Sequence, residues 1–482
     1  MKEICLDLNK GEIYNGFEVL EINDISDYKA KGIWLKHKAS DLEVFHIVCD
    51  DKENLFAFAF GTPSENSTGV AHILEHSVLC GSEAYPLKNP FIRLANQSIK
   101  TFLNAMTFPD KTVYPASSVS REDYFNLMAV YGDAVFFPKL EKWTFLQEGH
   151  RLELDANNEP SIQGVVYNEM KGNYSSFDGV ASDWVIKTML KDTIYDYDSG
   201  GDPLDIPNLT YEEYLNFHHV HYSPSNCKVF LYGDISTKEQ LDFLNSKILS
   251  RFKDFYFKEN SKKIKDKLTQ MKFPTRNFEK GPLIVEKPGP MEKNQTDSST
   301  VNISWCLEDA IDPISRMEII LLIEILMGHD GSPLSRALVE SNLGEDLVPN
   351  CGLFSEMKWS LLNTGLRGVP RENSQKVYQL VKNVIQNLYE NGIPQENLDA
   401  AILSVEFSQR EIQRFYGPYS LVLMRRCLQG WLYGFPPFYT MSYISAFKTV
   451  KERVLANSDY LRNLLKTHLI DNNYCGIITV YP

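Results

Sequence analysis

The segment His72-Ile73-Leu74-Glu75-His76 places two imidazoles and one carboxylate at a spacing that suits metal chemistry. Each residue advances about 100° around an α-helix, so His72, Glu75 and His76 would share one helix face. Two imidazoles at positions i and i+4 can bind one tetrahedral zinc ion. The carboxylate would lie beside the ion without binding it, where it can take a proton from water and later pass one to a leaving amine. The spacing therefore predicts a site for metal-assisted hydrolysis.

The alternative interpretation is a pair of surface histidines on an exposed helix. The neighbouring residues Gly69, Val70, Ala71, Ile73 and Leu74 argue against it, because they leave only three polar side chains on an otherwise apolar helix. A catalytic zinc ion also needs a third protein ligand and an open position for water. Glu169, in the segment 164–172, is a candidate for that ligand, and its alternative role is an ordinary solvated helix carboxylate.

Short strands and helices must position this motif. Alternation at period two predicts two strands within 41–62, and the motif itself lies in a predicted helix from about 69 to 80. The other elements predicted for the first half are helices at 89–102 and 163–175 and a strand at 227–232. The stretch 255–299 is rich in Lys, Glu, Pro and Asn, so we predict a linker followed by a lead-in strand there.

The second half repeats the alternation of strands and helices. Its predicted strands are 301–306, 360–367 and 474–480, and its predicted helices are 315–327, 333–341, 375–391 and 395–416. Both halves end in a similar apolar strand, which suggests an internal duplication. We therefore expect an α+β protein of two similar domains: a zinc-binding catalytic domain at 1–260, a linker and lead-in at 261–298, and a second domain without metal at 299–482.

Composition excludes several classes of protein. The chain has 482 residues, 12% of them aromatic, with 49 basic and 63 acidic side chains and a net charge of −14. The aromatic content argues against disorder, and the acidic balance argues against a nucleic-acid partner. The eight cysteines are scattered, which fits a reducing compartment. Without a recognisable signal or a stretch long enough to cross a bilayer, a cytoplasmic protein with no membrane partner is the expectation.

The chain carries, in this order, the segments HILEHSVLCGSEAYPLKNPF, TFLNAMTFPDKTVYPASS, FLQEGHRLE, GVVYNEMKGNYSS and SPLSRALVESNLGEDLVPNCGLFSE. Together they resemble the pitrilysin/insulinase superfamily of inverzincin metallopeptidases, and within it the presequence-protease and falcilysin branch. The resemblance runs from about residue 20 to the end. It implies one zinc ion held by His72, His76 and Glu169, with Glu75 as general base. It also implies a half clamshell of two domains, each a mainly antiparallel sheet packed by helices, as in mitochondrial processing peptidase.

The resemblance also suggests where a peptide substrate would bind. The segment containing Asn104, Ala105 and Met106 corresponds to an exposed sheet edge beside the metal, to which a peptide adds as an extra strand. An ordinary loop between strands is the alternative interpretation. Two other histidine groups are weaker candidates. The cluster at 218–221 lacks a shared helix face, and His150 replaces an aromatic residue common in relatives, so we expect packing roles for both.

The sequence departs from this branch in length, because members are about twice as long. Their second half supplies an Arg and a Tyr that clamp the substrate carbonyl, and Arg414-Phe415-Tyr416-Gly417 lies in the wrong context to replace them. Losing such a clamp can lower the rate by a factor on the order of 10²–10³. A C-terminal-half partner chain or a homodimer would restore a chamber. The leading hypothesis is a zinc endopeptidase, or half of one, that acts on short unstructured peptides. The alternative is a non-catalytic peptide-binding or scaffold subunit, or a weakly active truncated half.

Overall fold

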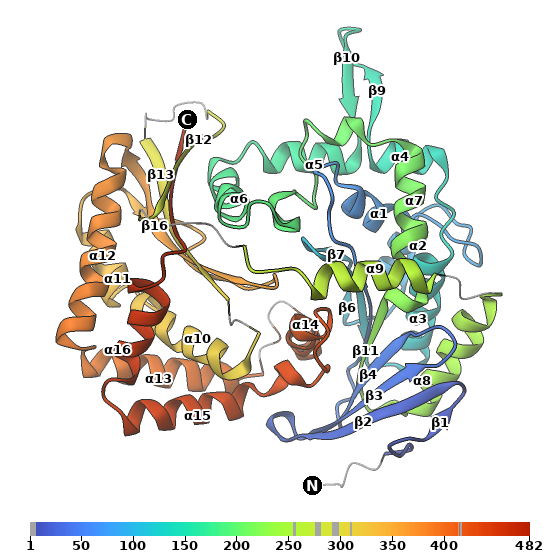
Figure 1. Cartoon of the computed structure of the whole chain (residues 1–482). Coiled ribbons are helices and arrows are strands. Elements are labelled where there is room, and N and C mark those ends of the chain that lie inside the picture. The colour runs from blue at the N-terminus through green and yellow to red at the C-terminus, as the bar shows by residue number, and fades with distance from the viewer. Residues whose placement is uncertain are drawn as a thin grey trace. The chain divides into compact units, whose positions relative to one another are not determined.

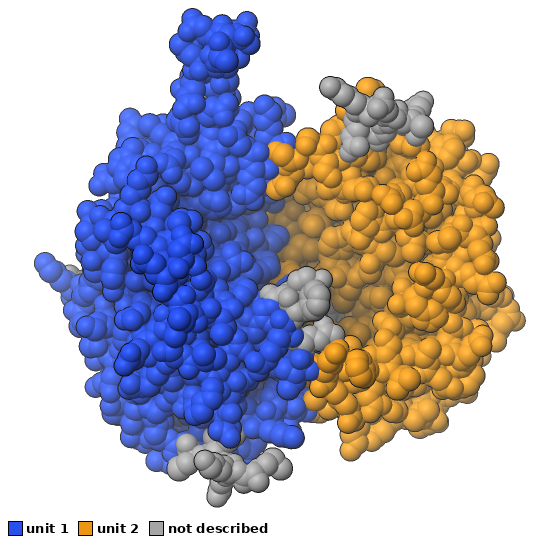
Figure 2. All heavy atoms as spheres, turned by 180° about the vertical axis from the view of Figure 1, so that it is seen from behind, with its two compact units in different colours: residues 1–171, 197–271, 412–441 blue, residues 172–196, 272–411, 442–482 orange. Residues whose placement is uncertain are grey.

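The computed structural model describes residues 6–253, 257–274, 281–291, 298–308, 311–412, 414 and 417–482. Contacts divide the chain into two compact units, shown in different colours in Figure 2. Unit 1 comprises residues 1–171, 197–271 and 412–441, and unit 2 comprises 172–196, 272–411 and 442–482. Each unit therefore includes a segment from the other half of the sequence. The domain boundaries at 260 and 299 stay a prediction, and the contact units differ from them in the segments 172–196 and 412–441.

Unit 1 is built on one mainly antiparallel sheet. Its nine described strands run in the order β1-β2-β3-β4-β11-β5-β8-β6, with β7 also paired to β8 (Figure 1). Only β11 and β4 pair in parallel. The strands are β1 (Ile13–Tyr14), β2 (Phe17–Ile25), β3 (Ala30–His37), β4 (Glu43–Val48), β5 (Asn54–Gly61), β6 (Phe102–Leu103), β7 (Met106–Thr107), β8 (Lys111–Ser118) and β11 (Cys227–Gly233). A separate hairpin joins β9 (Arg151–Leu154) to β10 (Pro160–Gln163).

Helices cover both faces of this sheet. They are α1 (Val70–Val78), α2 (Pro90–Gln97), α3 (Arg121–Phe136), α4 (Lys142–Glu148), α5 (Val165–Asn173), α7 (Tyr211–His221), α8 (Thr237–Phe243), α9 (Lys258–Thr269) and α14 (Tyr419–Trp431). Every residue of β5 is buried. The ring of Phe56 contacts Tyr124 and Tyr131 of α3, whereas Ala57 on the opposite face belongs to the core cluster that includes α14. Large rings on one face and alanines on the other thus fit a helix against each side of the strand.

Unit 2 has a smaller sheet of the same kind. The order of its strands is β12-β17-β13-β16-β14, with β15 also paired to β16. The strands are β12 (Leu283–Pro288), β13 (Ser298–Leu307), β14 (Asp346–Leu347), β15 (Gly352–Phe354), β16 (Ser360–Pro370) and β17 (Cys475–Tyr481). The helices are α6 (Phe177–Met189), α10 (Pro313–Met327), α11 (Pro333–Glu340), α12 (Ser374–Asn391), α13 (Gln395–Arg410), α15 (Tyr443–Ala456) and α16 (Tyr460–Leu465). The predicted α+β class with two similar domains is confirmed.

Most predicted elements are present, and three differ. The helix predicted at 89–102 ends at Gln97, and the helix predicted at 395–416 ends at Arg410. Phe415 and Tyr416 lie outside the described residues. The predicted linker contains α9, because Ile264 and Leu268 are four residues apart and both buried, which anchors a lysine-rich helix on unit 1. None of the helices in the described ranges is both long enough and apolar enough to cross a membrane.

Candidate metal and hydrolytic site

The helix α1 carries both predicted histidines, of which His72 is buried and His76 half-buried. It begins after Gly69, whose φ of +68° lies in the left-handed region. A Cβ atom at this residue would lie 2.7 Å from the carbonyl oxygen of Gly200, so only glycine allows the two backbones to approach this closely. The approach brings that carbonyl oxygen to His72, whose Nδ1–H donates to it at 3.0 Å.

These hydrogen bonds leave one nitrogen of each imidazole free for a ligand. His72 must carry its proton on Nδ1, because a carbonyl oxygen only accepts. His76 donates in the same way from Nδ1 to Oε2 of Glu148, at 3.3 Å. The Nε2 atom of each neutral ring then has a lone pair available for a metal ion. The two rings lie 5.0 Å apart between centroids, with an interplanar angle of 83°.

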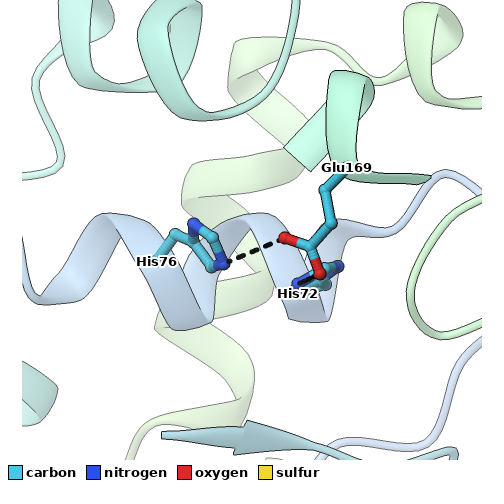
Figure 3. Close-up of side chains that lie close together, drawn as sticks. All are labelled: His72, His76 and Glu169. Carbon is cyan, nitrogen blue, oxygen red and sulfur yellow. Dashed lines mark ion pairs between the residues drawn. The ribbon is translucent and has the colours of Figure 1, made fainter. Parts of the chain in front are cut away.

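Glu169 completes a group of three ligand atoms. It lies on α5, and its two carboxylate oxygens are 3.8 Å from His72 Nε2 and 3.9 Å from His76 Nε2 (Figure 3). The ligand atoms of His72, His76 and Glu169 all lie within 4.8 Å of one another. A tetrahedral zinc ion with bonds of about 2.0–2.1 Å would separate its ligand atoms by roughly 3.4 Å. The chemistry and spacing of this donor set therefore fit a zinc ion with small adjustments of the side chains.

The position of α5 depends on a second close backbone approach. Gly164 precedes α5, and a Cβ atom there would lie 1.9 Å from the carbonyl oxygen of Gly149. Gly149 in turn follows α4, which ends at Glu148. The start of the helix that carries Glu169 is thus packed against the end of the helix that carries Glu148. A larger side chain at residue 164 would push the two carboxylates apart.

Glu75 is buried beside the histidines but is not a member of this group of three ligand atoms. Its carboxylate oxygen Oε2 accepts a hydrogen bond from the hydroxyl of Thr107, at 2.6 Å. Thr107 ends β7, a strand at the edge of the sheet of unit 1. This hydrogen bond therefore links the carboxylate of Glu75 directly to the edge strand β7.

The segment predicted to bind substrate lies at this edge. Asn104 and Ala105 fall between β6 and β7, and Met106 begins β7. Both short strands pair with β8, and no other described strand pairs with them. The amide of Asn104 donates to the carbonyl oxygen of Pro115 at 3.2 Å. The segment is therefore a sheet edge, interrupted by two residues, next to the histidine helix.

Acidic groups set the electrostatics around His76. Burial alone would lower its pKa, but the hydrogen bond to Glu148 and the charges of Glu75, Glu148 and Glu169 raise that pKa above its ordinary value. Three carboxylates around two imidazoles make a site that favours a divalent cation. Burial, followed by the charge of Glu148, raises the pKa of the Cys80 thiol to about 12, so Cys80 stays protonated at neutral pH and is a poor ligand.

The sequence did not single out Glu148, Gly200 or Thr107. Glu148 lies in the quoted segment FLQEGHRLE, where only His150 was considered. His150 in fact contacts the carbonyl oxygen of Leu209 through Nε2, at 2.9 Å, and packs on Phe145. In the other histidine cluster, half-buried His218 likewise contacts a backbone carbonyl through Nε2, at 2.9 Å. Neither histidine belongs to a metal-binding group of the described residues.

Models of one peptidase family match both halves of the sequence. Residues 60–176 match the family described as "Insulinase (Peptidase family M16)", and residues 208–405 match "Peptidase M16 inactive domain". The first match contains His72, Glu75, His76 and Glu169. The second match contains none of these four residues.

The most similar curated proteins include presequence protease 1 of Arabidopsis thaliana, 38% identical over 97% of this chain and 43% of that protein. The protein HypA of Clostridium perfringens is 34% identical over 99% of this chain and 48% of that protein. The chain thus spans about half the length of the curated relatives it matches.

Solved structures share the fold at low sequence identity. A protease from Helicobacter pylori has a TM-score of 0.69 and 17% identity, covering 94% of this chain and 100% of that chain. Pitrilysin has a TM-score of 0.61 and 15% identity, covering 97% of this chain and 46% of that chain.

Proposed function

The chain belongs to the insulinase family of peptidases, and from this membership we propose that it is a zinc-dependent endopeptidase, or the N-terminal half of one. Its substrates would be short unstructured peptides. The observation that carries the proposal is the convergence of His72, His76 and Glu169, with two free imidazole nitrogens facing one carboxylate. This arrangement supports the zinc site predicted from the sequence. A merely structural pair of surface histidines would need neither the hydrogen-bond partners at Nδ1 nor the carboxylate of Glu169.

His72 Nε2, His76 Nε2 and a carboxylate oxygen of Glu169 would hold the ion. A zinc ion bound there would polarise the scissile carbonyl and lower the pKa of water. The protein's own contribution is to present neutral imidazoles, because both Nδ1 protons are committed to Gly200 and Glu148. These outer contacts fix the orientation of the rings before any ion binds.

Glu75 would move the proton. Its carboxylate would accept a proton from the attacking water, whose oxygen forms a bond to the carbonyl carbon of the substrate. The same proton would then pass to the amine nitrogen as the C–N bond breaks. The hydrogen bond from Thr107 at 2.6 Å occupies Oε2 of Glu75. We therefore assign proton transfer to Oε1.

The peptide would bind along the segment from Asn104 to Met106. An edge strand offers unpaired backbone groups, so a peptide can add as another strand with little demand on its side chains. Because Thr107 links this edge to Glu75, a peptide bound there would lie next to the proton-transferring carboxylate. This mode of binding suits a peptidase that accepts many sequences.

The length of the relatives implies a further requirement. A second half, supplied by another chain or by a second copy of this one, would enclose the peptide and complete the substrate contacts. We propose the cytoplasm as the location. We also expect low activity from the chain alone, because groups that stabilise the transition state can contribute factors on the order of 10²–10³ to the rate.

The test is to measure bound zinc and the cleavage of an unstructured peptide of about 20 residues, with and without a candidate second half. Glu75→Gln should retain zinc and lose about 10²–10⁴-fold in rate, which is the usual contribution of a general acid–base group. Glu122→Gln, an exposed carboxylate on α3, is the matched control and should be fully active. Full activity of Glu75→Gln would remove Glu75 from the mechanism. Tight peptide binding without turnover, in the presence of zinc and the second half, would favour a scaffold subunit.

A further inference from the structure

Unit 1 contains a second polar site, remote in sequence from the histidine motif. A cavity of about 280 Å³ lies between α9 and the strands β3, β4 and β11, and α14 also lines it. Five lysines line this space: Lys36, Lys228, Lys258, Lys262 and Lys265. We call it the lysine cavity. So dense a group of cations is unexpected in a protein whose net charge is −14.

Two carboxylates also line the lysine cavity, and both are already fully engaged. Asp41 pairs with Lys36 at 2.9 Å and with Lys258 at 2.8 Å. Glu43 is buried and pairs with Lys228 at 2.5 Å. It also accepts hydrogen bonds from the indole nitrogens of two tryptophans, at 2.8 Å and 3.2 Å. Glu43 also interacts at longer range with the charge of Lys265.

The ammonium groups of Lys262 and Lys265 have no close carboxylate partner among the described residues, although the charge of Lys265 acts on Glu43. These ammonium groups make no hydrogen bond or ion pair among the residues that the structure describes. Five positive and two negative side chains give the lysine cavity a formal charge of 5 − 2 = +3. The cations interact with one another: burial lowers the pKa of Lys228, the contact with Glu43 raises it, and the charges of Lys265 and Lys36 add a smaller lowering. Mutual repulsion of this kind is relieved when an anion binds.

The spacing along α9 shows that the lysines form two separate faces. Lys258, Lys262 and Lys265 follow one another at i, i+4 and i+7, which places them on one side of the helix. Lys263 and Lys267 lie on the other side and line a different cavity, where Lys267 pairs with Glu65 at 2.8 Å. Among the described residues, the first face thus presents two unpaired cations, Lys262 and Lys265, to its cavity, and the second face presents one, Lys263.

Neutral donors add to the floor of the lysine cavity. Ser261 and Ser225 line it, and their hydroxyl oxygens lie 2.6 Å apart. Ser261 is buried, with 5% of its surface exposed, although its neighbour Lys262 is exposed. The hydroxyl of Ser261 donates to the carbonyl oxygen of Phe257 at 3.1 Å, so the hydroxyl of Ser225 is the one that can turn to an anion. Together with the three-donor ammonium groups it suits an oxygen-rich anion.

We propose that the lysine cavity binds an anion of the phosphate type, with two or more negative charges. The formal charge of +3 favours a dianion or trianion over a monocarboxylate, because each added charge gains attraction from the same fixed cations. A space of 280 Å³ admits orthophosphate or a short polyphosphate together with water. This site is independent of the metal site and of any peptidase activity.

The experiment is isothermal titration calorimetry of the full chain, freed of metal ions, with inorganic phosphate and with pyrophosphate at constant ionic strength. Removal of metal ions prevents pyrophosphate from acting by chelation at the histidines. We expect one anion per chain, with weaker binding as the salt concentration rises. Preference for pyrophosphate would indicate a polyphosphate ligand, and equal affinity would indicate a single phosphate group. Acetate at the same concentration should give no saturable signal.

Two double variants make the test specific. Lys262→Gln with Lys265→Gln should weaken binding at least about tenfold, because it removes the two unpaired cations. Lys263→Gln with Lys267→Gln removes the same charge from the opposite face of α9 and should change the affinity less than about twofold. The thermal midpoints of both variants without anion show whether the fold is intact. Absence of saturable binding by either anion in the wild type overturns the proposal, as does an equal loss in the two variants.

Discussion

Glu148 offers a sharp test of how the metal ligands are positioned. It touches neither the proposed ion nor a substrate, yet its Oε2 lies 3.3 Å from His76 Nδ1. Replacing it with Gln keeps the shape and one acceptor oxygen but removes the negative charge. A hydrogen bond to a charged group contributes about 1.5–3 kcal/mol, and a neutral one about 0.5–1.5 kcal/mol. The substitution therefore removes about 1–1.5 kcal/mol of support for His76, which corresponds to roughly tenfold in zinc affinity.

The same magnitude follows from metal sites in general, where loss of an outer partner lowers metal affinity by about 10–100-fold. The measurement is competition for zinc between the chain and a chromophoric chelator at pH 7.5. Glu141→Gln is the matched control, because this exposed carboxylate precedes the same helix, α4, and caps it with no side-chain hydrogen bond. Zinc affinity of Glu148→Gln within twofold of wild type, with the fold intact, would refute the positioning role. Equal weakening by Glu141→Gln would show a general loss of negative charge instead.

Three further outcomes can be measured. Burial lowers the pKa of His46 to about 3 in the folded chain, against about 6.5 in the unfolded chain. As the pH falls from 6.5 toward 3, the unfolded chain takes up a proton at His46 that the folded chain does not, so the folded chain becomes less stable. In urea unfolding, His46 should lower the free energy of unfolding by about 2 kcal/mol between pH 7 and pH 5, and His46→Gln should abolish this part of the pH dependence. Thr107→Val should lower kcat about tenfold without changing bound zinc, because the hydroxyl orients Glu75; an unchanged kcat contradicts this. Tyr433→Phe should destabilise the chain by about 1–3 kcal/mol in urea unfolding, since buried Asp110 loses the phenol hydrogen bond.

The histidine helix was predictable because its information is local. The spacing of His72, Glu75 and His76 fixes their shared face once the segment is helical, and the apolar neighbours favour a buried helix. Glu169 is 93 residues away from His76 in sequence, by 169 − 76, and only the resemblance to a family connected the two. Local pattern alone left Glu169 as an ordinary helix carboxylate.

The partners of the imidazoles could not be predicted in this way. Gly200 is 128 residues from His72, and Glu148 is 72 residues from His76. The contact of His72 depends on a carbonyl oxygen, which every residue type has, so no residue pattern marks it. Gly69 could have given a hint, because a glycine directly before a helix is typical of an unusual backbone angle or a close approach. The sequence does not say which backbone approaches.

The exchange of segments between the two units was also invisible in the sequence. The alternation of strands and helices suggested that each half of the chain folds by itself, but α14 completes the core of unit 1 from residues beyond 412. Trp431 is 2% exposed, contacts Phe45 on β4 edge-to-face, and donates its indole N–H to buried Glu43.

The sheet face that α14 covers carries small residues, including Ala57 and Ala59. A chain cut at residue 271 would leave this face in water, together with a buried carboxylate that had lost one of its donors. The helix α1, which holds the histidines, lies in unit 1 and begins nine residues after the end of β5, by 70 − 61. The alanine face of β5 is the face that α14 covers. The unit that holds the proposed metal site therefore includes residues 412–441 as well as 1–171 and 197–271. The smallest part of this chain that can keep the site ordered must include all three segments.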